Sequence, residues 1–125
     1  MIDSSAVIAT LAGEPEAERF ADTIATDGHV VVSAANYVEC AMVLSSRPLA
    51  RARLEPWMGA NSVSIAAIDE TLARGAIDAF GRFGKGRHPA GLNFGDCFAY
   101  ALAKSLDAPL LFKGGGFAKT DVQVA

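Results

Sequence analysis

The chain has 125 residues, which allows one hydrophobic core but not two, so we expect a single domain over residues 1–125. Its hydrophobic fraction is 51%, yet no run approaches the roughly 18 apolar residues that span a bilayer and no basic secretory signal begins it, so we expect a cytoplasmic protein with no membrane segment. The net charge of −3 does not exclude a nucleic-acid binder, because residues 1–46 carry the acidic excess and residues 47–119 have ten lysines and arginines against six acids.

The first half of the chain predicts alternating strands and helices. Residues 1–3 predict the end of a strand, because residues that cap helices follow at once, before an apolar run. A Gly-Glu-Pro break at 13–15 ends that helix and starts another. The β-branched run at 29–33 is typical of a strand buried in a parallel sheet. A helix follows, capped by the serine that ends this run, and carries Glu39 in its first two turns.

The second half continues the alternation. A shorter helix at about 48–58 precedes a strand at 62–66, and a long helix runs from 68–70 toward Phe83. The following segment, GKGRHPAG, has no apolar period and predicts a basic loop. The remaining predicted elements are a helix at 94–106 capped by Asn93, a strand at 109–112, a glycine-rich turn at 113–120 and a last strand at 121–124. Strands that alternate with helices predict an α/β fold with a parallel sheet covered on both faces.

Three acidic residues lie where loops and the amino termini of helices are expected to converge, at the edge where such sheets bind ligands. Asp3 directly follows the first strand, Glu39 lies early in the helix after the second, and Asp96 opens the helix that leads to a later one. Grouped carboxylates repel one another, and a shared Mg²⁺ or Mn²⁺ relieves this repulsion and can catalyse phosphodiester hydrolysis. Each acid alone is equally consistent with a helix cap or a solvated side chain, so their positions indicate only a candidate metal site.

Three parts of the sequence carry a resemblance to a known family. They are Met-Ile-Asp-Ser-Ser-Ala at 1–6, Glu39 in its helix and, most specifically, GKGRHPAGLNFGDCFAYALAKSLDAPLLFKG at 84–114. On these residues the chain resembles the PIN-domain ribonucleases, and among them the VapC-type toxins of bacterial toxin–antitoxin pairs. The resemblance implies a PIN-like three-layer α/β/α fold with a central, mainly parallel sheet of four to five strands. It also implies a metal-dependent endoribonuclease that cleaves tRNA, rRNA or mRNA.

The same resemblance implies roles for individual residues and partners. Asp3, Glu39 and Asp96 would be the catalytic acids that hold Mg²⁺ or Mn²⁺. The hydroxyl group of Ser5 would lie close to them, and Asn93 would support the turn that presents Asp96. A cognate VapB-type antitoxin would inhibit the enzyme, and a homodimer would be the usual assembly.

One position departs from the family pattern. Similar proteins have Lys-Gly, then Asp or Asn, then Asp-Phe, where this chain has KGGGF at 113–117, so a fourth carboxylate is missing at Gly116. Asp121, in the following turn, is then the candidate fourth acid. The alternative to a nuclease is a catalytically weakened PIN-like module that binds RNA or an antitoxin without cutting. A third alternative is an unrelated α/β domain whose acids only cap helices.

The densest basic stretch directly precedes the helix with Asp96. Arg82, Lys85, Arg87 and His88 are therefore the candidate contacts for RNA phosphates, although a solvated loop would show the same pattern. His88 precedes a proline and is expected to pack the loop or contact RNA rather than bind a metal.

Overall fold

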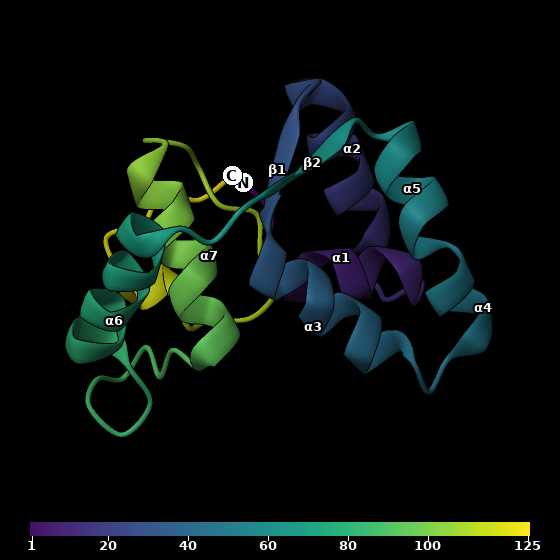
Figure 1. Cartoon of the computed structure of the whole chain (residues 1–125). Coiled ribbons are helices and arrows are strands. Elements are labelled where there is room, and N and C mark those ends of the chain that lie inside the picture. Colours follow the sequence, from purple (N-terminus) through teal and green to yellow (C-terminus); the bar gives the residue numbers. More distant parts are fainter.

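The computed structural model describes all residues, 1–125, and has helices on both sides of a narrow parallel sheet (Figure 1). In chain order the elements are α1 (Ser4–Leu11), α2 (Ala17–Asp27), β1 (Val30–Ser33), α3 (Ala34–Leu44), α4 (Pro48–Ala52), α5 (Leu54–Ala60), β2 (Val63–Ala66), α6 (Glu70–Phe83), α7 (Phe94–Ser105) and the 3-10 turn η1 (Phe117–Lys119). Helices α1 to α5 pack on one side of the strands and α6 and α7 on the other. The predicted three-layer α/β/α architecture is confirmed.

The sheet extends from β2 to the carboxyl terminus of the chain. β1 and β2 pair in parallel along their whole length. Next to β1, the backbone N–H of Ile2 donates to Val31 O at 3.0 Å. Ile2 forms a parallel bridge with Leu111, and Leu110 forms another with Val124. The order is therefore β2, β1, residues 1–3, residues 110–111 and residues 123–125.

The expected number of strands is only partly realised. Two of the five predicted strands, β1 and β2, are continuous, and the other three segments join the sheet by isolated bridges. Two of these segments are short for a local reason. Asp3 already caps α1, and a glycine-rich turn follows residue 112. The order of the segments is that of a five-stranded parallel sheet, although three of its members are too short to form strands.

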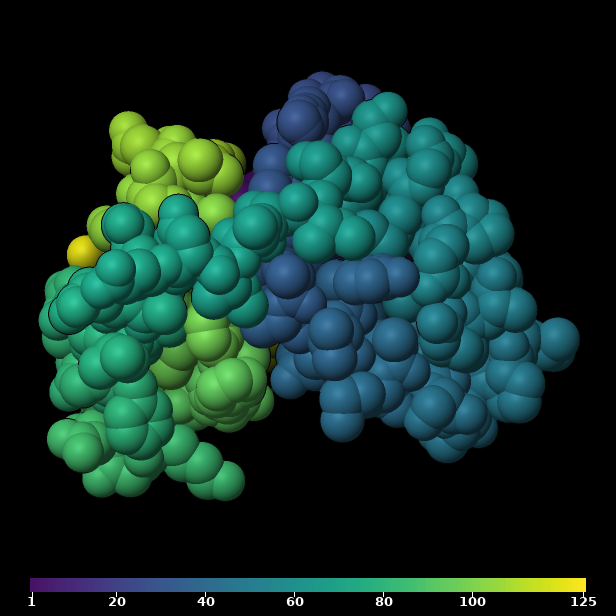
Figure 2. Space-filling model, in the orientation of Figure 1, coloured from purple at the N-terminus to yellow at the C-terminus, as the bar shows by residue number.

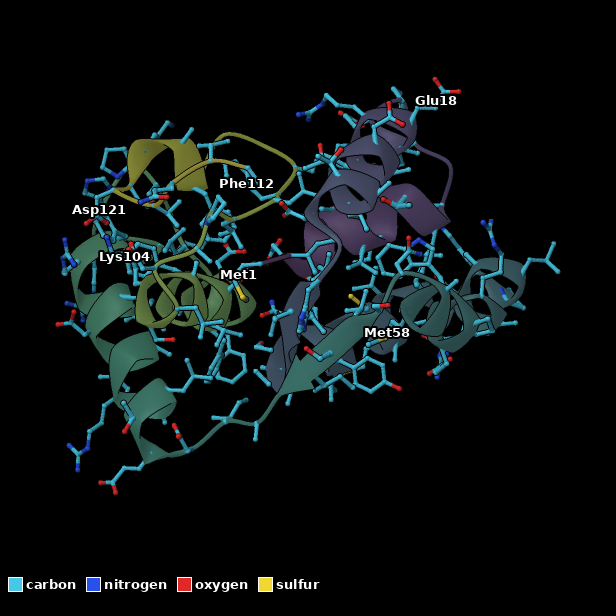
Figure 3. The ribbon with its side chains drawn as sticks, turned by 90° about the horizontal axis from the view of Figure 1, so that it is seen from above. Met1, Glu18, Met58, Lys104, Phe112 and Asp121 are labelled. Atoms are coloured by element: carbon cyan, nitrogen blue, oxygen red, sulfur yellow. The ribbon has the colours of Figure 1, made fainter.

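The expected single core is divided into two apolar clusters, one packed against each face of the sheet. Val30 and Val32 lie in the core beneath α1 to α5, whereas Val31 between them packs against the core beneath α6 and α7. Ile2 and Met1 divide between the two cores in the same way. Seen from above, Met1 lies near the centre of the molecule, between the two groups of helices (Figure 3). The β-branched run of β1 is therefore buried on both faces, as alternate side chains of a strand in a three-layer fold must be.

One predicted helix is divided in the structure. The helix expected at 48–58 is interrupted at Arg53, between α4 and α5. Pro56 explains the break, because it has no N–H to donate to the carbonyl of Ala52 and its ring would collide with that carbonyl in a continuous helix. Proline is tolerated in the first turn of α5, where that donor is not needed. None of the helices has the length and apolarity required to cross a membrane.

Candidate metal centre

Asp3 is fixed where the first extended segment turns into α1. Its Oδ2 accepts hydrogen bonds from Ser5 N at 2.9 Å and from Ser5 Oγ at 2.5 Å, and so caps the helix. Its Oδ1 accepts a bond from Asn36 Nδ2 at 3.3 Å. Asp3 is 1% exposed, and this burial raises the pKa of its carboxyl group; the bonds from Ser5 oppose the rise and the charge of Glu39 adds to it. The structure therefore places the Ser5 hydroxyl directly against Asp3.

Glu39 approaches the same region from α3. Its Oε1 accepts a hydrogen bond from the buried Ser4 hydroxyl. On its other side the carboxylate lies against the backbone of Gly95, where an added Cβ would come within 2.7 Å of both Glu39 oxygens. A residue with a side chain at position 95 would therefore displace Glu39. The glycine allows α3 to bring its acid up to the first turn of α7.

Asp96 lies in the first turn of α7, as predicted. Asn93 Oδ1 accepts from Asp96 N, and Asp96 Oδ2 accepts from Asn93 N, both at 2.9 Å, so the two residues form a capping box. Burial raises the pKa of the Asp96 carboxyl group to about 6; the bond from Asn93 opposes the rise, and the charges of Asp3 and Glu39 add to it. Asp96 is therefore ionised at neutral pH in an environment that disfavours its charge.

The three acids form one electrostatic group, although they come from three segments of the chain. Their charges raise the pKa values of Asp3 and Asp96, and no protein donor binds Glu39 Oε2 or Asp96 Oδ1. The atoms that could bind a metal ion here are all carboxylate oxygens, the ligands that Mg²⁺ and Mn²⁺ prefer. As the side chains stand, no three His, Cys, Asp or Glu residues form a group that could hold a metal ion, so the metal site stays a prediction.

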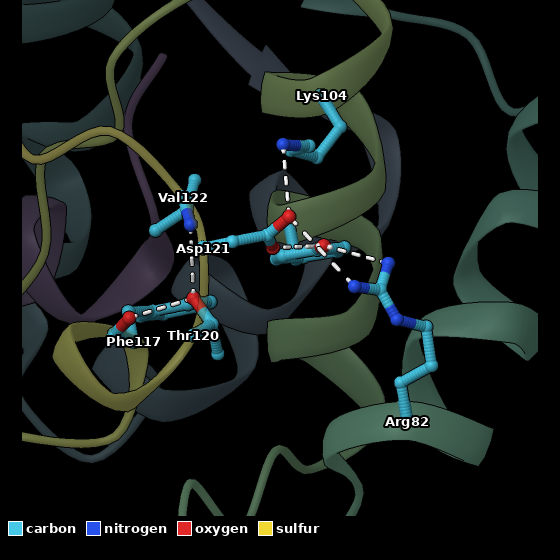
Figure 4. Close-up of polar contacts among 7 residues, drawn as sticks. Arg82, Lys104, Phe117, Thr120, Asp121 and Val122 are labelled. Carbon is cyan, nitrogen blue, oxygen red and sulfur yellow. Dashed lines mark hydrogen bonds and ion pairs between the residues drawn. The ribbon is translucent and has the colours of Figure 1, made fainter.

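Asp121 lies in a different cluster (Figure 4). Its Oδ1 accepts a hydrogen bond from Tyr100 Oη at 2.5 Å, its Oδ2 accepts one from Lys104 Nζ at 3.2 Å, and Arg82 Nη2 lies 3.7 Å from Oδ2. The bonds from Tyr100 and Lys104 lower the pKa of Asp121. The structure therefore does not bring the candidate fourth acid into the acidic group.

Gly116 precedes η1 and packs closely on the preceding loop. An added Cβ would lie 2.8 Å from Ala90 O, although the backbone φ of −62° is ordinary for any residue. The absence of a side chain therefore serves a close contact with Ala90 rather than an unusual backbone conformation. An aspartate at this position would require one of the two loops to shift.

A family model described as the PIN domain matches residues 1–123. The chain belongs to the PIN-domain family. It is 48% identical to Ribonuclease VapC of Mycolicibacterium smegmatis, over 98% of this chain and 96% of that protein. It is 44% identical to Ribonuclease VapC30 of Mycobacterium tuberculosis, over 98% and 95%, and 42% identical to Ribonuclease VapC28 of the same species, over 100% and 96%. The resemblance carried by residues 84–114 is confirmed.

The basic loop of this PIN domain has two kinds of cation. Lys85 and Arg87 are exposed and form no ion pair. Arg82 instead belongs to the cluster around Asp121. His88 stacks edge-on against Phe83 with ring centroids 5.1 Å apart, and its Nδ1 accepts a backbone hydrogen bond from Ala90 at 3.0 Å. His88 therefore packs the loop, one of the two roles expected for it.

Three further residues contact the acidic group and were not predicted from the sequence: Ser4, Asn36 and Gly95. Ser4 and Asn36 are buried polar residues that bind Glu39 and Asp3, and Gly95 makes room for Glu39. Only Asn36 has a recognisable sequence signal. It precedes Glu39 by three residues, which places both on one face of the helix. The contacts of Ser4 and Gly95 depend on the approach of α3 to α1 and α7, which no local pattern specifies.

The surface beside Glu39 is hollowed between α3 and α7 (Figure 2). The hollow has a volume of about 630 Å³ and is lined mainly by apolar side chains, among them Val38, Met42 and Phe94. A second, wholly apolar hollow of about 420 Å³ lies between α6 and α7 and shares Phe94, which is 77% exposed. This PIN domain therefore exposes continuous apolar surface next to its acidic group.

Proposed function

We propose that this PIN-domain protein is a metal-dependent endoribonuclease and the toxin of a toxin–antitoxin pair. One observation carries the proposal. Asp3, Glu39 and Asp96 form one electrostatic group in a chain 48% identical to a protein named Ribonuclease VapC. Metal-assisted hydrolysis of a phosphodiester needs no nucleophilic side chain, and the hydroxyl groups of Ser4 and Ser5 donate to Glu39 and Asp3.

The three acids fit a hard divalent cation in donor type and charge. Asp3, Glu39 and Asp96 would hold Mg²⁺ or Mn²⁺, and the raised pKa values of Asp3 and Asp96 support this, because a cation relieves unfavourable negative charge. When bound, such a cation polarises the phosphodiester and lowers the pKa of water. Ser5 and Ser4 orient Asp3 and Glu39 by donating hydrogen bonds, and Asn93 holds Asp96 in the first turn of α7.

The basic loop is the proposed contact for the RNA backbone. Lys85 and Arg87 are exposed and without carboxylate partners, so they are free to bind phosphates. Arg82 would have to leave Asp121 to do so, and His88 would contact RNA only from its packed position in the loop. Replacing Lys85 or Arg87 with Gln should weaken RNA binding and reduce its salt dependence, with a slope lower by about 1 for each phosphate that is no longer neutralised.

A cognate VapB-type antitoxin and a second copy of the chain are the proposed protein partners. The apolar hollows around Phe94 supply surface for one of them next to the acids. An antitoxin that covers Glu39 and Asp96 would exclude RNA and cation together. Size-exclusion chromatography with light scattering distinguishes monomer from dimer, and co-expression with the product of the neighbouring reading frame tests the antitoxin.

The activity is tested with the purified chain and a mixture of tRNA and rRNA. Cleavage is expected with Mg²⁺ or Mn²⁺, and EDTA should stop it. Asp96→Asn should abolish cleavage and leave the circular dichroism spectrum unchanged. Asp78→Asn, which changes an exposed aspartate of α6, is the matched control and should retain activity. Cleavage by Asp96→Asn at the wild-type rate would exclude the proposed mechanism.

A non-catalytic binding module is the second candidate, favoured by Gly116. This module would bind RNA or an antitoxin but cleave no RNA under any metal condition. The two candidates give opposite results in the same assay, because only the nuclease responds to added metal and to EDTA. Binding without cleavage by the wild-type chain would select the module.

A further inference from the structure

Asn36 is a buried amide that joins the three chain segments that carry the acidic group. It is 0% exposed and lies three residues before Glu39 in α3. Its Nδ2 donates to Asp3 Oδ1 at 3.3 Å and to the backbone O of Gly95 at 3.1 Å. Its Oδ1 accepts a bond from Ser33 Oγ at 2.5 Å. Every polar atom of this side chain is therefore used at the junction of the first extended segment, α3 and α7.

The partners of Asn36 explain why an amide stands here. A carboxylate and a backbone carbonyl only accept hydrogen bonds, so the side chain between them must donate twice. A lysine or arginine could donate twice, but its positive charge beside Asp3 would compete with a cation for that carboxylate. The neutral amide of Asn36 satisfies Asp3 and leaves its negative charge available. Because the site is buried, bulk water would not replace these bonds if the amide were removed.

We propose that Asn36 is a positioning residue that holds the first turn of α7, and with it Asp96, in place beside Asp3 and Glu39 for binding a divalent cation. The inference rests on the proposed metal-dependent function. Asn36 acts through the Asp3 carboxylate and the Gly95 carbonyl, and it contacts neither the cation nor the RNA. Loss of a supporting residue of this kind typically weakens metal affinity by about 10–100-fold.

The test compares Asn36→Ser with Asn61→Ser in the full chain. Asn61 is the matched control because its amide also donates to a backbone carbonyl, that of Trp57, but at the end of α5 and outside the acidic group. Mn²⁺ binding is measured by isothermal titration calorimetry at a temperature where all the proteins are folded. Asn36→Ser should bind Mn²⁺ about 10–100-fold more weakly than wild type, and Asn61→Ser should match wild type.

Saturating Mn²⁺ separates positioning from a general loss of folding. Under that condition cleavage by Asn36→Ser should recover most of the wild-type rate, because the defect lies in cation affinity. A merely structural role would lower the rate at every Mn²⁺ concentration without shifting the concentration for half-maximal activity. The loss of a supporting residue is expected to weaken Mn²⁺ affinity by about 10–100-fold. An Asn36→Ser variant whose Mn²⁺ affinity is within about twofold of the wild-type affinity would therefore overturn the inference.

Hydrogen exchange of the metal-free protein distinguishes failure of this inference from failure of the proposed function. If the wild-type chain binds no Mn²⁺, the proposed metal-dependent function fails, and the exchange result alone decides the role of Asn36. The backbone amides of Asp96 and Cys97, which donate to Asn93, should exchange several-fold faster in Asn36→Ser, because α7 is no longer tied to α3 by the side chain of Asn36. Unchanged exchange there overturns the inference. If Asn36→Ser does not fold, Asn36→Thr, which fills more of the vacated space, replaces it in each measurement.

Discussion

Removal of the Asp96 charge should stabilise the metal-free protein while it abolishes cleavage. Asp96 is partly buried and its carboxyl group has a pKa raised from the usual 3.8 to about 6. A rise of that size corresponds to about 3 kcal/mol of unfavourable charge in the folded state. Because Asp96 is partly exposed to solvent, which screens the charge, the gain from Asp96→Asn is reduced to about 1–2 kcal/mol. The amide oxygen of asparagine can still accept the bond from Asn93, so the helix cap is retained.

The assay is thermal unfolding of wild type and Asp96→Asn in EDTA, followed by circular dichroism. A gain of about 1–2 kcal/mol corresponds to a rise in Tm of about 5 °C for a chain of this length. The sign of the pH dependence follows from the direction of the pKa change. Because the carboxyl pKa is raised on folding, the Asp96 charge destabilises the fold by its full amount at pH values above about 6. The destabilisation decreases as the pH falls from about 6 toward 3.8, and it is absent at pH values below both pKa values.

The difference in Tm between the two proteins should therefore be largest at pH 7.5 and about half as large at pH 5. Asp78→Asn, the control on the surface of α6, should show no such gain. A variant less stable than wild type at pH 7.5, or a difference that grows as the pH falls, would refute the electrostatic account of the acidic group.

Three further substitutions test other parts of the site. Gly95→Ala should reduce cleavage at least tenfold, because the added Cβ would displace the Glu39 carboxylate. The Tm should fall little, because alanine is favoured over glycine in a helix by about 1 kcal/mol. Cleavage assays measure the first effect and thermal unfolding the second. Asp121→Asn should lower stability by about 1 kcal/mol and leave the specific activity unchanged, and a loss of activity would make Asp121 a site acid after all. Gly116→Asp should lower stability by about 1–3 kcal/mol, because its Cβ would lie 2.8 Å from Ala90 O, and increased cleavage in this variant would identify the native chain as a weakened nuclease.

The features predicted well from the sequence are those that depend on neighbouring residues. Asp3 caps its helix through a residue two positions away, and Asn93 and Asp96 form their capping box within one turn. The β-branched run of β1 specifies a strand buried on both faces. Local chemistry of this kind places Asp3 and Asp96 at the start of their helices. The break before Pro56 was equally local and was overlooked, although the proline alone indicates it.

Features that depend on distant parts of the chain could not be predicted in this way. Asp121 was the candidate fourth acid because of its place in the turn after Gly116, but Tyr100, which is 21 residues away, binds its carboxylate. Glu39 contacts Gly95, and Asn36 binds the backbone of the same residue 59 positions later. Such contacts arise only when the sheet brings α1, α3 and α7 together, because hydrophobic periodicity identifies elements but not their separation in space.

The same electrostatics links the stability of this PIN domain to its proposed cofactor. In EDTA the Asp96→Asn variant should be the more stable protein, because it lacks a charge that burial disfavours and that Asp3 and Glu39 also repel. A cation that binds only the folded wild type stabilises it by about 2.7 kcal/mol at a concentration 100 times its Kd. That gain exceeds the roughly 1–2 kcal/mol expected for the variant, so the order of the two Tm values should reverse when Mn²⁺ is added. Reversal would show that the acidic group is unfavourable for folding and favourable for binding, as expected of a site selected for function rather than for stability.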